Sequence, residues 1–161
     1  MASLDDFYAI SVALTGYNET SLQGTGVGDT YLSTLTSIVG TPITDELFAV
    51  YNEIAAHCGN MEELNREIRI QIMSHEKLGP VARNIIKMWY TANWYQMPAE
   101  WSDRFGTFAQ DDCGNFLDSD HVISGEAYDQ SLVWLAMEAH PMGARQPGYG
   151  TWAFPPHKET V

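Results

Sequence analysis

Apolar residues recur at intervals of three and four along most of the first ninety positions, a spacing typical of amphipathic helices. The pattern predicts a first helix that begins after Ser3 and ends at Gly16, and a second from Thr30 to Gly40. Ser3 suits an N-cap, and the two glycines suit C-terminal stops. Residues 17–28 show no such spacing and are predicted to form a loop.

The helical pattern continues through the middle of the chain. A third helix is expected from Thr44 to Gly59, and a fourth from Asn60, with Glu63 three residues later as in a capping box. The broadest apolar stripe belongs to a fifth helix that begins at Leu78, and its width indicates the central helix of a bundle. The stripe consists of Leu78, Val81, Ala82, Ile85, Ile86 and Trp89.

The C-terminal third is less regular. Residues 98–123 are predicted to form a long acidic loop, and residues 124–134 a sixth helix. In residues 141–161, aromatics lie among prolines and glycines, which favour neither a helix nor a central strand. We therefore expect a single all-α domain. Its helical body, residues 1–140, is a bundle of five or six helices, followed by an extended aromatic and proline-rich C-terminal arm.

The charge of the chain is strongly negative. The chain has 21 acidic residues and 8 Lys and Arg, which gives a formal net charge of −13. Residues 1–65 hold nine acids and no Lys or Arg. Such a field opposes binding to nucleic acid or to an anionic membrane surface, and solubility is its simplest role. The chain has no apolar run of membrane-spanning length and no signal peptide at its start. A natural start and the removal of a leader both fit the sequence.

Candidate chemistry is sparse. The glycine-rich run at residues 24–28 lacks a preceding strand and a P-loop lysine, so a flexible connection is favoured over a phosphate loop. The five histidines are scattered without a ligand spacing, and no catalytic set emerges. Cys58 and Cys113 fit one disulfide or two thiols.

The acidic loop holds enough oxygen-bearing side chains to suggest calcium. Their spacing is not that of an EF-hand, so a solvated loop is the simpler interpretation. These residues are Asp111, Asp112, Asn115, Asp118 and Asp120.

Aromatic residues in the second half divide into two groups. Trp89 and Tyr128 fit core packing. A second group lies beside proline and glycine or outside the helical pattern, and it is predicted to form a partner interface together with one arginine, since Trp, Tyr and Arg dominate interface energetics. The predicted interface residues are Trp94, Tyr95, Trp101, Arg145, Tyr149, Trp152 and Phe154.

Four short motifs occur in order along the chain. They are Phe7-x-x-x-Ser11-x-x-Leu14-Thr15-Gly16, Ile85-Ile86-x-x-Trp89-Tyr90, Tyr128-x-x-Ser131-Leu132-x-Trp134 and Pro147-Gly148-Tyr149-x-x-Trp152-x-x-x-Pro156. In these motifs the chain resembles the small (gamma) subunit of the FAD-dependent sugar and polyol dehydrogenases. This group includes gluconate 2-dehydrogenase subunit 3 and the small subunits of the sorbitol, fructose, glucose and glucoside 3-dehydrogenases.

The resemblance covers residues 6–156, with three departures. The twin-arginine leader of the family's precursors is absent, and the segment between Tyr90 and Tyr128 is longer than expected. The tail has the run PGYGTW where relatives have a more compact PGYW-like run.

The resemblance implies a non-catalytic subunit. In such complexes the FAD, the substrate pocket and the catalytic histidine belong to a large subunit of the glucose-methanol-choline (GMC) oxidoreductase type, in some cases joined by a cytochrome c subunit. The small subunit clamps the large one and supports its folding, flavin loading and export. No cofactor is then expected on this chain itself.

The same resemblance implies a periplasmic complex, with the cytoplasm as the alternative because the leader is absent. Two functions of other classes stay open. One is a stand-alone helical enzyme with a pocket lined by Trp89, Tyr90 and Trp134. The other is an acidic calcium-binding module.

Overall fold

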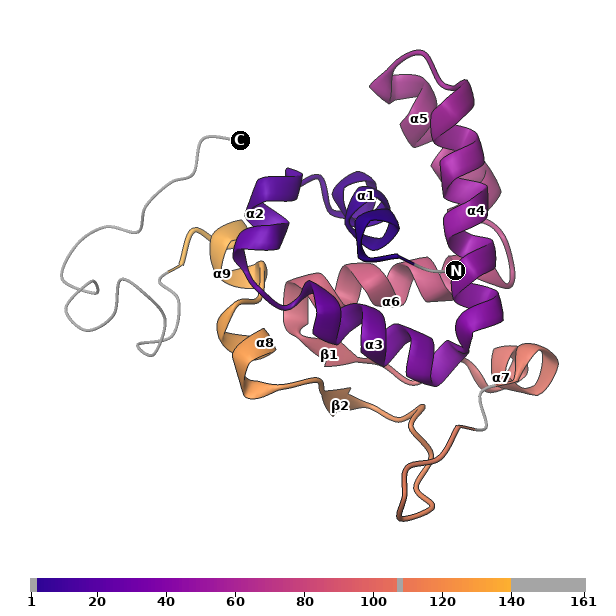
Figure 1. Cartoon of the computed structure of the whole chain (residues 1–161), viewed down its shortest axis with the longest axis vertical. Helices are drawn as coiled ribbons and strands as arrows, with labels where there is room; N and C mark the ends of the chain where they lie inside the picture. The colour runs from indigo at the N-terminus through magenta and orange to yellow at the C-terminus, as the bar shows by residue number, and fades with distance from the viewer. Residues whose placement is uncertain (1–2, 107–108, 140–161) are drawn as a thin grey trace, which may run out of the picture.

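The computed structural model describes residues 3–106 and 109–139, and the fold there is all-α apart from one short pair of strands (Figure 1). This confirms the predicted fold class. The longer helices are α1 (Leu4–Thr15), α3 (Gly28–Val39), α4 (Thr41–His57) and α6 (Leu78–Thr91). None of the described helices has the length and apolar character needed to cross a membrane.

Helix α6 is the centre of the bundle, as its apolar stripe predicted. It contacts α1, α3 and η1 (Ile68–Met73), the π-helical segment that follows α5 (Met61–Glu67). Trp89 of α6 is 1% exposed and packs against aromatic rings from two helices. Its ring centroid lies 6.0 Å from that of Phe7 and 4.9 Å from that of Tyr31. Burying one such ring contributes about 2–3 kcal/mol.

Near the N-terminus the predicted loop over residues 17–28 is wrong in part, because it contains α2 (Glu19–Gly24). The Asn18 side chain caps this helix by accepting a hydrogen bond from the Ser21 N–H at 2.8 Å. Only Leu22 of α2 is buried, so this six-residue helix leaves no apolar period in the sequence.

Two predicted helix starts also need correction. Helix α3 begins at Gly28 rather than Thr30, and α4 begins at Thr41 rather than Thr44. Pro42 lies in the first turn of α4, where its missing N–H costs no hydrogen bond. Thr44 is not the cap, since its hydroxyl donates to the Gly40 carbonyl within the helix at 3.0 Å.

The Asn60 cap of α5 is confirmed, because its side chain accepts a hydrogen bond from the Glu63 N–H at 2.9 Å. The Glu63 carboxylate accepts from the Gly59 N–H instead of closing the predicted capping box on Asn60. The helix then widens into η1, a π-helical geometry that the sequence pattern does not reveal.

The predicted loop over residues 98–123 contains α7 (Ala99–Phe105) and ends in a short strand. Strand β1 (Asn93–Trp94) pairs with β2 (His121–Val122) in antiparallel register, with Trp94 opposite His121. Ala92, which ends α6 with a left-handed φ of 56°, turns the chain into β1.

The predicted sixth helix is split into α8 (Gly125–Asp129) and α9 (Val133–Ala136). The N-cap Ser124 is confirmed, because its hydroxyl accepts the Ala127 N–H at 3.0 Å. Between the two helices, the Leu132 N–H donates to the Trp89 carbonyl at 2.9 Å. Because the Leu132 N–H binds α6 in this way, the predicted sixth helix is interrupted between α8 and α9.

We expect Gly79→Ala to lower the free energy of unfolding by about 1–3 kcal/mol, although alanine favours helices. A Cβ at Gly79 would lie 2.5 Å from the Met73 carbonyl oxygen, which belongs to the backbone and yields little. Urea unfolding followed by circular dichroism measures the effect. The matched control is Gly24→Ala, whose Cβ would meet nothing within 4 Å. Equal losses in the two variants would contradict the close approach of η1 and α6.

We expect Tyr31→Phe to leave stability at neutral pH unchanged or higher, because the buried Tyr31 hydroxyl has no hydrogen-bond partner among the described residues. Burial also raises the pKa of the Tyr31 phenol above its ordinary value of 10.0. The folded state then retains a proton that the unfolded chain loses, so the free energy of unfolding falls as the pH rises above 10.

Tyr31→Phe should therefore reduce this alkaline loss in urea titrations at neutral and alkaline pH. The loss should not vanish, since burial raises the pKa of Tyr8 and Tyr51 as well. An unchanged alkaline slope in the variant would contradict the role given to Tyr31.

Candidate partner-binding surface

The first three motifs of the sequence meet in one place, which we call the motif junction (Phe7, Thr15, Trp89, Tyr90 and Leu132). Phe7 stacks on Trp89, and the Tyr90 hydroxyl donates to the Thr15 carbonyl at 3.1 Å. The Leu132 N–H is bound to the Trp89 carbonyl, and the Leu132 side chain is 1% exposed. Segments far apart in the sequence are therefore held together by aromatic packing and backbone hydrogen bonds.

Beyond the junction the chain exposes apolar side chains. The Tyr128 and Trp134 rings pack edge to face at 5.8 Å, and the Trp134 indole N–H donates to the Tyr128 carbonyl at 3.1 Å. Tyr128 stays 39% exposed, Val122 56% and Met137 68%. We call Tyr128, Trp134 and Met137 the tail-root surface, because they directly precede residues 140–161 in the sequence. Exposed apolar side chains gathered in one stretch are typical of an interaction surface.

The predicted interface residues fall into three groups. Trp94 is fully buried and Trp101 is 4% exposed, so neither ring is presented to a partner in this structure. Tyr95 is partly exposed, and the Lys87 ammonium lies 4.6 Å from its ring centroid. The other predicted residues lie outside the described part of the chain: Arg145, Tyr149, Trp152 and Phe154.

Trp94 and Trp101 are buried because each has a polar partner inside the chain. The Trp101 indole N–H donates to the Lys77 carbonyl at 2.8 Å, which fastens α7 to the start of α6. The Trp94 indole N–H donates to the Asp118 carboxylate at 2.9 Å. Both indole N–H groups are thus satisfied inside the chain, so these two residues are better explained as core than as free surface.

Asp118 is a structural residue that the sequence analysis counted only as a calcium candidate. It is 6% exposed, and its Oδ1 accepts hydrogen bonds from the Trp94 indole and from the Met97 N–H at 3.0 Å. Asp120 adds a second attachment by accepting the Gln96 N–H at 2.7 Å. Asp118 and Trp94 are 24 positions apart, and no local pattern marks the pair.

The calcium alternative finds little support in the geometry. The Asp111 carboxylate accepts the backbone N–H groups of Cys113 and Asn115 within its own turn, at 2.9 and 2.8 Å. Asp118 and Asp120 face the 94–97 segment instead. In the part of the chain that the structure describes, no group of three His, Cys, Asp or Glu side chains is arranged to hold a metal ion.

The enzyme alternative required an open pocket at Trp89, Tyr90 and Trp134. Trp89 is enclosed by Phe7 and Tyr31, so a substrate would reach it only if helices moved apart.

The two cysteines are both free thiols, with Cys58 partly buried and Cys113 exposed.

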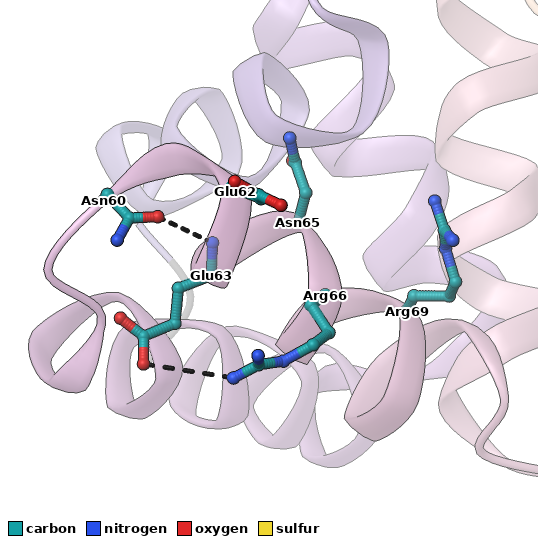
Figure 2. A pocket seen from close by; sticks show the side chains of 6 residues that line it. All are labelled: Asn60, Glu62, Glu63, Asn65, Arg66 and Arg69. Atoms are coloured by element: carbon teal, nitrogen blue, oxygen red, sulfur yellow. Dashed lines mark hydrogen bonds and ion pairs between the residues drawn. The ribbon is translucent and has the colours of Figure 1, made fainter.

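A wide cleft of about 850 Å³ runs along the exposed face of α5 and the start of η1 (Figure 2). Arg66 reaches the Glu63 carboxylate at 4.0 Å and that of Glu67 at 3.2 Å. The cleft thus carries both positive and negative side chains, so it favours neither anions nor cations. Its lining residues are Asn60, Glu62, Glu63, Asn65, Arg66 and Arg69.

Comparison of the chain with models of protein families found no match, and comparisons with curated proteins and with solved structures found none either.

We expect Asp118→Ala to lower the free energy of unfolding by about 2–5 kcal/mol, since it leaves the Trp94 indole and the Met97 N–H buried without their acceptor. Asp118→Asn keeps an acceptor oxygen and should cost less. Urea unfolding followed by tryptophan fluorescence measures both variants. The control is Asp112→Ala, an exposed acid of the same loop, with an expected change within about 0.5 kcal/mol. Equal effects at positions 112 and 118 would contradict the structural role of Asp118.

Proposed function

We propose that this chain is a non-catalytic small subunit that binds and stabilises a large FAD-dependent dehydrogenase of the GMC type, acting on a sugar or glycoside. The observation that carries the proposal is the motif junction. Three of the four motifs on which the resemblance rests come from α1, α6 and the α8–α9 segment, and they contact one another directly.

The junction also supports a mechanism of binding. It fixes residues 128–134 against the bundle and so gives the C-terminal arm a rigid point of departure. A fixed origin lowers the conformational entropy that an extended arm loses when it binds. In this proposal Tyr149, Trp152 and Phe154 are the apolar anchors and Arg145 a polar one, with the tail-root surface continuing the contact.

The chemistry then belongs to the partner. The large subunit would hold the FAD, the substrate pocket and the catalytic histidine, and a cytochrome c subunit would take the electrons in complexes that have one. This chain would assist folding and flavin loading. The complex is proposed to lie in the periplasm, or in the cytoplasm if no leader directs its export.

The test is to recover the tagged full-length chain from its native host and to measure bound flavin and sugar-dependent reduction of an artificial electron acceptor. We expect a co-purifying flavoprotein with this activity. Trp152→Ala should reduce the recovered flavin about 30-fold, the effect of a hot spot worth about 2 kcal/mol. Truncation after Ala139 should do the same while circular dichroism still reports a folded helical body.

The matched control in the arm is His157→Ala, which should leave flavin recovery unchanged. Full recovery of active flavoprotein with the truncated chain would contradict the proposal. Turnover by the homogeneous chain alone would support the enzyme alternative instead, and a calcium-dependent rise in melting temperature would support the calcium-binding one.

A further inference from the structure

Helix α5 has one long face that the other described elements leave uncovered. None of its residues is buried, and it packs mainly against η1 and α4, its neighbours in the chain. Figure 1 shows α5 projecting beyond the other helices, away from α8 and α9. The wide cleft of Figure 2 runs along this face, which is therefore accessible to another molecule.

The charges on this face are balanced, unlike those of the chain as a whole. Glu62, Glu63, Arg66 and Arg69 give it two negative and two positive charges, whereas the net charge of the chain is −13. Arg66 and Arg69 are also the first two basic residues in the sequence. Two copies of so acidic a chain repel each other, and a locally neutral face lowers that repulsion where they touch.

Two of these four charges are not paired within the described part of the chain. Arg66 reaches Glu63 and Glu67, but neither Glu62 nor Arg69 has a hydrogen-bond or ion-pair partner among the described residues. Asn65 lies between them at helical spacing, and Figure 2 shows Asn65 and Arg69 pointing to the same side. This side of the segment thus begins with an unpaired acid and ends, two turns later, with an unpaired base.

We propose that a second copy of this chain packs antiparallel on this face, so that two copies form a symmetric dimer through α5 and the start of η1. A twofold axis level with the Asn65–Arg66 peptide bond brings Glu62 of each copy opposite Arg69 of the other, because both residues are equally far from that level. The unpaired acid and the unpaired base of each copy then pair twice across the axis.

Exposed apolar side chains flank these charges. Met61 is 62% exposed and Ile70 is 58% exposed, at the two ends of the same segment. The twofold axis brings Met61 of one copy level with Ile70 of the other, since these positions are also equally far from it. Covering part of their surface adds an apolar contribution to the two ion pairs.

The proposed contact is small, so the dimer should be weak. Residues 61–70 form about three turns of helix, and interfaces of this size belong to transient contacts. Exposed ion pairs strengthen such a contact only modestly. We expect a dissociation constant of about 100 µM. This inference does not rest on the proposed function, which concerns the tail-root surface and the C-terminal arm.

The experiment measures the mass of the purified full-length chain by sedimentation equilibrium at concentrations from about 10 µM to about 1 mM, around the expected dissociation constant. Arg69→Glu and Glu62→Arg should each weaken the dimer at least about tenfold, because each change occurs twice and places like charges opposite each other. The matched control is Glu100→Arg, the same charge change at an exposed position of α7, which should leave the dissociation constant unchanged.

Two combinations test the pairing itself. The double variant Glu62→Arg/Arg69→Glu exchanges the two charges without altering the net charge, and it should restore the dissociation constant to within about threefold. An equimolar mixture of the two single variants should form a mixed dimer, because one copy then offers two bases and the other two acids. Circular dichroism checks that the variants keep their helices. A monomer at all concentrations, a dimer that Arg69→Glu does not weaken, or rescue by neither combination would overturn the inference.

Discussion

The packing of Trp89 is the constraint on which the rest of the structure depends. Its indole fills the space between α1 and α3, so the first, third and sixth helices share one aromatic centre. Its backbone carbonyl binds the Leu132 N–H and thereby holds the C-terminal segment as well. One residue thus joins the bundle to the segment that leads into the arm. The Trp89 side chain is buried in the bundle, and its backbone carbonyl positions the C-terminal segment.

Sequence periodicity predicted those helices whose apolar positions form a stripe. Helix α6 is the clearest case, because its buried residues repeat over four turns. Helices α2 and α7 were missed because Leu22 and Trp101 are the only buried side chains that they contribute. A single buried residue has no period, so only the tertiary contact shows that the segment is helical.

The same limit applies to the candidate sites, because the sequence shows which side chains are present but not which distant residues they contact. From aromatic composition we expected a partner interface in the second half of the chain, and we included Trp94 and Trp101, which the structure buries. Their burial depends on Asp118 and on the Lys77 carbonyl, 24 positions away in each case. The pocket lined by Met97, Asp103 and Phe116 could not be predicted either, because strand pairing and a distant turn bring its walls together.

The attachment of the acidic segment through Asp118 and Asp120 bears on how the molecule opens. Residues 109–123 are held to the body by the Asp118 and Asp120 carboxylates, by two paired strand residues and the Ile123 N–H on the Ala92 carbonyl, and by two partly buried apolar side chains, Leu117 and Ile123, whereas α1, α3 and α6 share a continuous core. Regions with few buried apolar contacts exchange their amide protons through local openings of low free energy. The acidic segment can therefore detach and return as a unit while the helices stay assembled, so its amides should lose protection from solvent exchange long before those of α6.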